Sequence, residues 1–553
     1  MKKTPLLWTL QKIRRRIPAV ILLTATQMGS ALLAVVFALG SRNVIDSAVS
    51  GDVLLFQNAC VRQALIIGGL VTLMALSRHL RDRLGMDLER DWKRQLFHRL
   101  LCGDYTAVAS YHSAELLNRL NNDVTRVNDG LLSLIPGTAA MAARLAGALA
   151  VLGVLDGRFT LLALLLGAAV IGATALMRRR LKALNRQVSE HDGRVSALLQ
   201  EGMEKLLMIQ AMDVSRELER RADSLMDDRY RVQRKRKNVS LVTGTGVAVL
   251  SYGMAFLALG WCSWQMLQGR MTFGALTAVI QLVGQLQGPV FNLSGVMPQY
   301  AAMTASAERL MELEAIPEEA PAMADIPEAV YSKMDSLCAE DLSFSYDREK
   351  ILDKAAFSLP RGCFAAITGA SGIGKSTILK LLLGIFPPEE GSLFLRCADE
   401  KIPLDRSARG LFAYVPQGNL LLSGTLRENL TIVRPDATDA QIQQALHVSA
   451  MEEFLPQLPN GLDTQLGESG AGLSEGQAQR LAIARAVLGG APILLLDECT
   501  SALDARTEQT VLERLKALPD RTCIAVTHRP AALALCDLRL EVADGKIHCV
   551  SFR

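Results

Sequence analysis

The feature that most constrains this chain is a run of 24 residues, 17–40, that contains no charged side chain. An α-helix of about 20 residues crosses the hydrocarbon layer of a bilayer, so this run is long enough to span a membrane. Five further apolar runs lie near residues 63–77, 145–155, 159–177, 239–264 and 271–297. The sequence therefore predicts an all-α transmembrane domain over residues 17–315, with six membrane-spanning helices.

The charge of the connecting segments predicts how these helices are oriented. Segments 1–16, 78–133 and 178–240 hold 6, 9 and 16 Lys and Arg residues, whereas the alternate connections hold only Arg42, Arg62, Arg158 and Arg270. By the positive-inside rule, both termini and the two long segments lie in the cytoplasm. We expect a multi-pass protein of the cytoplasmic membrane, which begins at residues 1–16 with a short cytoplasmic helix in the membrane interface. A cleaved secretory signal is the less favoured alternative, because five more apolar runs follow the first.

The composition changes twice along the chain. Segments 78–133 and 178–240 are rich in Arg, Glu, Asp and Leu, which indicates membrane helices that continue into the cytoplasm as solvated rods. The prolines and acids of residues 316–336 are typical of a linker. From residue 337 to 553, short apolar runs alternate with helical stretches; the clearest are 364–368, 411–416, 493–497 and 522–527. This alternation predicts an α/β domain with a largely parallel core sheet.

Charge divides the chain in the same way. Residues 1–320 carry 37 basic and 26 acidic side chains, whereas residues 321–553 carry 23 and 30. The basic half suits an anionic inner leaflet, so membrane lipids are expected partners. The net charge of +4 over 553 residues is too small to indicate a nucleic-acid binder, and we expect no nucleic-acid partner.

The C-terminal domain contains a phosphate-binding loop of the pattern G-x-x-x-x-G-K-[ST]. It consists of Gly369, Ala370, Ser371, Gly372, Ile373, Gly374, Lys375, Ser376 and Thr377. The glycines allow the backbone to fold around phosphates with its N–H groups pointing inward. Lys375 is expected to neutralise the β- and γ-phosphates, and Ser376 to bind Mg²⁺, while the following helix offers its positive N-terminus. The loop predicts ATP and Mg²⁺ as cofactors.

The ends of two further strands carry candidate catalytic residues. Residues 493–496 are an apolar strand that ends in Asp497 and Glu498. A carboxylate at the end of a buried parallel strand lies beside the phosphate loop, where Asp497 can hold Mg²⁺ and Glu498 can orient the attacking water as a base. His528 closes another apolar strand and can reach a γ-phosphate from there.

A third element is a capped helix start. Ser474, followed three residues later by Gln477, predicts a capping box, with Gly476 between them. The start of a capped helix is an anion site. Because the chain already has one phosphate loop, this second site can serve a nucleotide that another copy holds.

These motifs, in this order, resemble the nucleotide-binding domain of ATP-binding cassette (ABC) transporters. Together with the six apolar runs, the chain resembles an exporter-type half-transporter, in which a membrane domain and an α/β P-loop ATPase domain of the ABC type are fused. The resemblance covers essentially the whole length and is most specific in residues 340–530. It implies a translocase-type ATPase that works as a dimer of half-transporters.

The resemblance also implies roles for single residues. Tyr346 would stack on adenine, and Gln417 would sense Mg²⁺ and the attacking water. Ser474 and Gly476 would contact the γ-phosphate bound to the partner subunit, and Asp504 would link the two sites of the dimer. Segments 115–123 and 202–213 resemble the two cytoplasmic turning points that dock on the ATPase, and Glu468 would touch them.

One position departs from the family pattern, which has glycine where this chain has Glu475. An acid in a first helical turn suits the helix dipole, but it also adds negative charge near an incoming γ-phosphate. A side chain that points away leaves the site normal, whereas one that points inward weakens it, as in heterodimers with one impaired site. A homodimer is favoured over a heterodimer, and both stay open.

The membrane domain offers a candidate substrate cavity. Arg144 is the one charged residue deep within an apolar run, 12 residues before Asp156 and hence about 18 Å inward. Such a charge lines a cavity or pairs within the helix bundle. Gln281 and Gln285 share a helix face by their i, i+4 spacing. They and Arg144 are the candidate contacts for a substrate that the sequence does not identify.

The favoured function is therefore ATP-driven export by alternating access. A nucleotide-gated channel or regulatory ATPase, and import through an exporter-like fold, are the alternatives. Flux against a gradient in proteoliposomes distinguishes the first of these from a transporter, and the direction of flux distinguishes the second.

Overall fold

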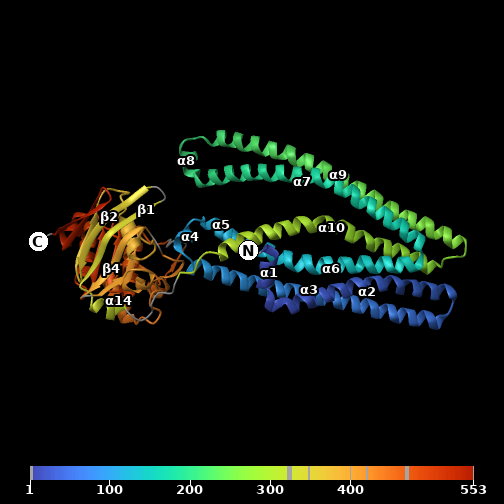
Figure 1. Cartoon of the computed structure of the whole chain (residues 1–553), viewed down its shortest axis with the longest axis horizontal. Coiled ribbons are helices and arrows are strands. Elements are labelled where there is room, and N and C mark those ends of the chain that lie inside the picture. Colours follow the sequence, from blue (N-terminus) through green and yellow to red (C-terminus); the bar gives the residue numbers. More distant parts are fainter. Residues whose placement is uncertain are drawn as a thin grey trace. The chain divides into compact units, whose positions relative to one another are not determined.

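The structure of the protein is a computed structural model (Figure 1), which describes residues 4–319, 327–346, 349–398, 400–418, 421–467 and 472–551. The chain forms two compact units. Unit 1 comprises Met1–Leu101 and His112–Ala315, and unit 2 comprises Cys102–Tyr111 and Ile316–Arg553. The second unit therefore takes in a short piece of chain from between the membrane helices.

Unit 1 is all α-helical. Its elements are α1 (Pro5–Lys12), the 3₁₀ turn η1 (Arg14–Arg16), α2 (Ile17–Ser50), α3 (Val53–Cys102), α5 (Ser113–Asn118), the π-helical turn η2 (Arg119–Asp123), α6 (Val124–Leu155), α7 (Gly157–Glu204), α8 (Leu206–Ala211), α9 (Ser215–Leu267) and α10 (Phe273–Glu314). Each of the six apolar runs lies in one of the helices α2, α3, α6, α7, α9 and α10. In the described part of the chain, four helical stretches are long and apolar enough to cross a membrane, Arg14–Ser50, Val53–Cys102, Ser113–Leu155 and Ser215–Leu267.

Local signals explain where these helices begin and end. Gly51, with φ of +75°, ends α2 in the left-handed conformation that glycine adopts without strain. The carboxylate of Asp156 accepts hydrogen bonds from the first N–H groups of α7, at Arg158 and Phe159. Asp46 accepts one from Gly274 N at 2.9 Å, at the start of α10. The turns between the long helices are thus held by capping acids.

The helices pack as two groups. α2, α6 and α10 contact one another, and α7 packs along α9 as a long hairpin with α8 at its tip (Figure 1). A buried ion pair ties η2 to α10, because Asp123, fully buried, accepts hydrogen bonds from Ser306 at 2.8 Å and Arg309 at 2.7 Å. Arg119 donates to Glu312 at 2.9 Å beside it. Each of these buried charges has an opposite partner, as burial requires.

The first turning point between the long helices differs from the expected 115–123. The chain turns between Cys102 and Tyr111, where Asp104 caps the short helix α4 (Tyr105–Ala109), and residues 115–123 fall within α5 and η2 of the returning helix. Gly103-Asp104, a glycine followed by a capping residue, is the local signal for this turn. The second turning point is α8, inside the expected 202–213.

The N-terminal helix, which is expected to lie in the membrane interface, has one face packed on the helix bundle. α1 packs on other helices of unit 1, since Trp8 is buried, lies edge-on to Trp92 at 5.8 Å and donates to Glu314 at 2.5 Å. Leu6 and Leu7 stay exposed. One face of α1 is thus packed against the bundle, and the other is exposed.

Unit 2 is the expected α/β domain. Its strands are β1 (Ser336–Tyr346), β2 (Glu349–Pro360), β3 (Phe364–Thr368), β4 (Glu390–Cys397), β5 (Glu400–Pro403), β6 (Phe412–Val415), β7 (Gly424–Thr425), β8 (Gln465–Leu466), β9 (Ile493–Asp497), β10 (Thr522–Val526), β11 (Leu538–Ala543) and β12 (Lys546–Ser551). Its helices are α4, α11 (Pro327–Ser332), α12 (Lys375–Leu382), α13 (Leu426–Thr431), α14 (Asp439–Val448), α15 (Glu475–Leu488), α16 (Ala505–Lys516) and α17 (Pro530–Leu535), with 3₁₀ turns at Arg406–Leu411, Leu455–Gln457 and Gly461–Asp463.

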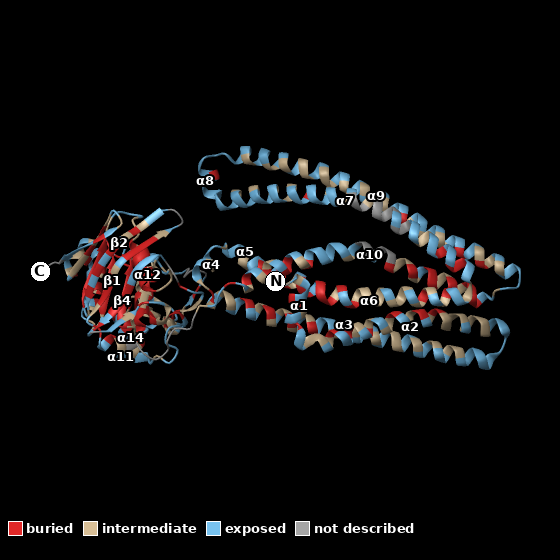
Figure 2. Ribbon diagram, viewed as in Figure 1, coloured by how far each residue is buried: buried red, intermediate tan, exposed pale blue. Residues whose placement is uncertain are grey.

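The core sheet has the order β12-β11-β3-β10-β9-β6, and all its strands but β12 run parallel. An antiparallel sheet, β2-β1-β4-β5, packs against it. Both faces of the core sheet are covered: in β9, Ile493 and Leu495 enter one hydrophobic cluster, and Leu494 and Leu496 enter another. Uninterrupted apolar strands are the signature of such a sheet. In Figure 2, buried residues gather on the strands of unit 2.

The expected linker, 316–336, contains structure of its own. Ile316 is buried, and Glu319 N donates to Cys102 O at 2.9 Å. Further on, α11 packs on unit 2 through Tyr331, whose hydroxyl lies 2.9 Å from Thr522 Oγ1. Both ends of the expected linker therefore belong to unit 2.

Candidate active site

The phosphate loop connects β3 to α12 in the middle of the core sheet. Gly369, Gly372 and Gly374 have φ angles of +151°, +80° and +103°. A Cβ at Gly374 would lie 2.2 Å from Ile351 Cγ2, so this position has no room for a side chain. The loop therefore needs its glycines for both conformation and space.

Lys375 opens α12 and folds back over the loop. Its Nζ donates to Gly369 O at 3.0 Å and to Ala370 O at 2.8 Å. These two carbonyls hold the ammonium group against the phosphate loop, which continues through Ser371 and Ile373. An anion bound at the loop would be stabilised by the charge of Lys375, by the N–H groups of the loop and by the N-terminal end of α12. Thr377 lies in the first turn of that helix.

Strand β9, which is separated from β3 by β10 alone, places a buried carboxylate beside the phosphate loop. Asp497, 2% exposed at the end of β9, accepts hydrogen bonds from Ser376 Oγ at 2.9 Å and Tyr414 Oη at 3.2 Å. Burial raises the pKa of Asp497, and the bonds from Ser376 and Tyr414 offset this only in part. A buried carboxylate beside a hydroxyl is the oxygen donor set that Mg²⁺ prefers, and a cation would stabilise its charge. The residues present thus fit the predicted metal.

Three predicted catalytic residues meet beside Asp497. Gln417 Nε2 donates to Glu498 Oε2 at 2.7 Å, and His528 Nδ1 lies 4.0 Å from Glu498 Oε1. Glu498 has φ of +47°, a left-handed conformation that is strained for glutamate. Its backbone N–H bonds to Val526 O of β10, which fixes the strained turn. Strain held by the surrounding sheet is typical of functional positions.

Tyr346 lies at the end of β1 in an aromatic cluster. Its ring meets Phe344 edge-on at 5.0 Å and Phe386 at 5.5 Å. The hydroxyl lies 3.5 Å from Thr377 Oγ1 on the phosphate-loop helix. At 39% exposure the ring retains a free face, as a role in stacking on a base requires.

The capped helix start is present as predicted. Ser474 caps α15, where Gln477 N donates to Ser474 Oγ at 3.3 Å and Ser474 N donates to Gln477 Oε1 at 2.8 Å. Glu475 is exposed in the first turn, and a Cβ at Gly476 would lie 2.8 Å from Ala502 O. No hydrogen bond joins this helix start to the phosphate loop in the described residues. Glu468 lies outside the described residues.

Asp504 has a local partner in this chain. Its side chain caps α16 by accepting a hydrogen bond from Thr507 N at 3.0 Å, and hydrogen bonding by the Thr507 side chain, together with this backbone bond, lowers the pKa of Asp504. The cap leaves the second carboxylate oxygen for another contact.

A hydrogen-bond network that was not predicted from the sequence holds residues 500–504. Arg529 donates to Ser501 O at 2.6 Å, to Leu503 O at 2.9 Å and to the buried carboxylate of Glu508 at 2.8 Å. On the other side, Gln479, buried in α15, donates to Ser501 Oγ at 3.0 Å and accepts from Ala502 N. Arg529 follows His528, and Gln479 lies two residues after Gln477. Adjacency to a motif is the only sequence signal that they have.

The candidate substrate residues lie on α6 and α10. The half-buried Arg144 guanidinium makes no hydrogen bond or ion pair with any described residue. Gln285 Nε2 donates to Ala34 O at 2.7 Å, which ties α10 to α2. The Oε1 atoms of Gln281 and Gln285 are buried without a partner among the described groups. The two glutamines thus have unused hydrogen-bond acceptors, and no hydrogen bond joins Arg144 to either of them among the described residues.

Fold and site together define the class of P-loop nucleotide-binding proteins, here with helices long enough to cross a membrane in the same chain. Comparison with known proteins narrows the class. The ABC transporter transmembrane region matches residues 17–290, and the ABC transporter domain matches residues 352–501. The chain belongs to the ABC transporter family, as an exporter-type member with a fused membrane region and ATP-binding domain.

Individual relatives agree with this. A solved structure, described as a bacterial Atm1-family ABC exporter with ATP bound, is 26% identical with a TM-score of 0.78, covering 98% of this chain and 95% of that one. A probable ABC transporter ATP-binding/permease protein of Haemophilus influenzae is 32% identical over 335 residues, 60% of this chain and 59% of that protein. The mitochondrial potassium channel ATP-binding subunit of Homo sapiens is 28% identical over 503 residues, 89% of this chain and 68% of that protein.

Proposed function

We propose that the protein exports a substrate across the cytoplasmic membrane by alternating access, driven by ATP hydrolysis in a dimer of half-transporters. The observation that carries this proposal is the meeting of Gln417, Glu498 and His528 beside the Ser376–Asp497 pair. It supplies the parts that phosphoryl transfer to water needs, namely a phosphate cradle, metal ligands and a base.

Each residue has a distinct task in hydrolysis. The loop N–H groups and Lys375 bind the phosphates, and Tyr346 supports the adenine. Glu498, held by Gln417, orients a water and accepts its proton as the water oxygen bonds to the γ-phosphorus and the bond to the β-phosphate oxygen breaks. His528 binds the γ-phosphate. Mg²⁺ held by Ser376, Asp497 and Gln417 would neutralise the charge that develops on the phosphate oxygens.

A second subunit completes each site in this proposal. Ser474, Gly476 and Gln477 offer an exposed, capped helix start without a phosphate of its own, which suits the γ-phosphate held by the partner. Asp504 would link the two sites. Glu475 is exposed in the same first turn, and a homodimer remains the favoured assembly.

In the proposed cycle, ATP closes the two ATPase domains head to tail and the long helices pass this closure to the membrane. We assign residues 1–16 to the N-terminal helix, 17–315 to a six-helix domain and 337–553 to the ATPase domain, with 316–336 as the connecting segment, whose described ends pack within unit 2. The basic ends of the long helices favour a cytoplasmic ATPase.

Glu498→Gln tests the proposed base. The amide keeps the size of the side chain and can still accept from Gln417, but it cannot take a proton. ATPase activity of the full chain in proteoliposomes should fall about 100-fold or more, with ATP binding retained and a closed dimer trapped. Glu513→Gln, the same change on an exposed turn of α16, is the matched control. Normal turnover by Glu498→Gln would refute the role.

A second candidate function, a nucleotide-gated channel or regulatory ATPase, is supported by the similarity to the human mitochondrial potassium channel ATP-binding subunit. It predicts ATP-dependent conductance without uphill flux. Import is a third reading. Flux against a gradient in proteoliposomes separates the channel from a transporter, and its direction separates import from export.

A further inference from the structure

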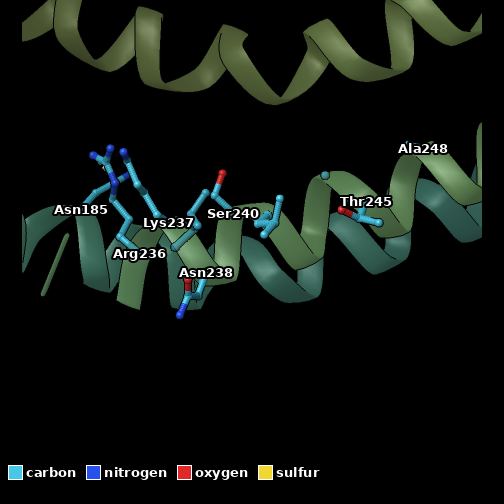
Figure 3. A pocket seen from close by; sticks show the side chains of 10 residues that line it. Asn185, Arg236, Lys237, Asn238, Ser240, Thr245 and Ala248 are labelled. Carbon is cyan, nitrogen blue, oxygen red and sulfur yellow. Dashed lines mark hydrogen bonds between the residues drawn. The ribbon is translucent and has the colours of Figure 1, made fainter. Parts of the chain in front are cut away.

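A pocket of about 800 Å³ lies between α7 and α9, outside the nucleotide site and away from Arg144 in the sequence (Figure 3). It is lined by Leu181, Asn185, Arg236, Lys237, Asn238, Ser240, Leu241, Gly244, Thr245 and Ala248. None of these residues belongs to a motif of the proposed function.

One end of the pocket is strongly basic. Arg236 and Lys237 close a run of four basic residues that begins at Arg234. Arg236 reaches Asn185 at 3.5 Å, and Lys237 has no hydrogen bond or ion pair with the described residues. No acidic residue occurs between Asp228 and Glu308 on this part of the chain, or between Asp156 and Glu190 on α7. The cations of the pocket therefore lack an acidic partner on either of its helices.

The other end is apolar and lined by small residues. Leu241 is 68% exposed, and Gly244 has open space where a Cβ would lie. From Arg236 to Ala248 the helix rises about 18 Å, at 1.5 Å per residue. The apolar run of α9 begins at residue 239, so the pocket starts at the last cations and continues about three turns into the apolar part.

We propose that this pocket binds an anionic phospholipid of the leaflet that faces the basic segments, with the phosphate at Arg236 and Lys237 and an acyl chain along Leu241, Gly244 and Ala248. A ligand that is anionic at one end and apolar for about three helical turns matches both halves of the pocket. Basic pockets between membrane helices bind such headgroups. A soluble anion would leave the apolar half unused, and an apolar helix of a second copy would leave the cations unpaired. The assignment of the leaflet to the cytoplasm rests on the proposed topology.

Native mass spectrometry of the purified full chain tests the site, with dioleoyl phosphatidylglycerol as the probe and dioleoyl phosphatidylcholine as the zwitterionic comparison. The chain should retain phosphatidylglycerol preferentially. Arg236→Gln with Lys237→Gln should weaken this binding roughly 10- to 30-fold, since each cation near an anionic headgroup contributes about 1 kcal/mol and 1.4 kcal/mol is tenfold. Arg216→Gln with Arg220→Gln, two exposed arginines nearer the tip of the hairpin, is the charge-matched control and should leave binding unchanged.

A second pair of variants tests the apolar half without touching the charge. Gly244→Leu fills the groove and should also weaken binding, whereas Gly246→Leu, which has open space but does not line the pocket, should not. Equal loss in both pairs, or no loss in either, overturns the site. Displacement by glycerol phosphate at equal concentration would show a soluble-anion site and overturn the lipid assignment. Because lipid retention is measured without ATP, failure of the site and failure of the export proposal remain distinguishable.

Discussion

At the scale of single residues, the buried carboxylate of Asp497 shows how a site can be built at the expense of stability. Ser376 and Tyr414 supply two hydrogen bonds, yet burial still raises the pKa of Asp497 above its ordinary value. When the pKa of a carboxyl group is raised in the folded state, folding favours its protonated form over its ionised form. At neutral pH the ionised carboxylate therefore lowers the stability of the fold, and a bound cation would reduce this loss.

This gives a pH-dependent prediction for Asp497→Asn in the full chain without nucleotide. Because the pKa of Asp497 is higher in the folded state than in the unfolded state, protonation stabilises the fold at low pH and that contribution is lost as pH rises through the folded-state pKa. The Asn variant should therefore unfold a few degrees higher than the parent at pH 7, since about 1 kcal/mol moves Tm by about 2–4 °C. The difference should shrink as pH falls toward 4. Thermal unfolding at several pH values measures it; a variant less stable than the parent at pH 7 contradicts the prediction.

The predictability of the site also divides residue by residue. The phosphate loop, Asp497, Glu498 and His528 could be predicted because each follows an apolar strand, and parallel strands bring their carboxyl ends to one edge. Gln417 could be named only by family resemblance, although it lies after β6 at the same edge. Arg529 and Gln479 could not be predicted, because their partners are backbone groups of residues 501–503, which come together only in the folded domain.

At the scale of elements, residues 500–504 form a loop held from two sides. Arg529, which follows the β10 strand, bonds two of its carbonyls, and Gln479 of α15 bonds its amide and hydroxyl groups. The capped helix start at Ser474 and the cap at Asp504 are thereby placed by one network. Any shift of α15 is expected to reach Asp504 through it.

Arg529→Met tests this network. The change leaves the carboxylate of Glu508, 3% exposed, without its cation, and removing one partner of a buried ion pair typically costs about 3–5 kcal/mol. Because Arg529 is 31% exposed, we expect about 2 kcal/mol in unfolding of the ATPase domain, with a loss of ATPase activity. Arg506→Met, exposed on α16, is the control.

A second variant separates the ion pair from the loop contacts. Arg529→Met combined with Glu508→Gln removes the buried charge but keeps an acceptor for Thr500, so most of the stability should return. ATPase activity should stay low, because Ser501 and Leu503 still lack their donor. Full recovery of activity in the double variant would show that the loop contacts are irrelevant.

Element boundaries show where sequence patterns stop being informative. The long helices were predictable from apolar runs and from the lack of glycine and proline between them. The turn at Cys102–Tyr111 was not, because charge continues unchanged through it and only Gly103-Asp104 marks it. The association of α11 with unit 2 was hidden by prolines and acids on either side of Tyr331, whose contact with Thr522 spans 191 positions.

At the scale of the whole molecule, a charged residue within a membrane helix requires a specific explanation, because a charge is costly there. Asp46 and Asp156 are explained by the helix starts that they cap. Arg144 is not, since it has no partner among the described residues and lies 12 residues, about 18 Å, from the turn at Asp156. A charged group at that depth without a partner is a functional-site candidate.

A substitution of Arg144 tests whether this arginine contacts the substrate in the proposed dimer. Arg144→Gln removes the charge but keeps a hydrogen-bonding side chain, and because no described group relies on Arg144, stability and basal ATPase activity should change little. Stimulation of ATPase activity by substrate should be lost, as measured over a panel of peptides, lipids and amphiphilic compounds in proteoliposomes. Arg158→Gln, an exposed arginine at the outer end of α7, should keep that stimulation. If Arg144→Gln unfolds the chain, or if every stimulating compound acts on it as on the parent, Arg144 is a structural residue and the substrate cavity lies elsewhere.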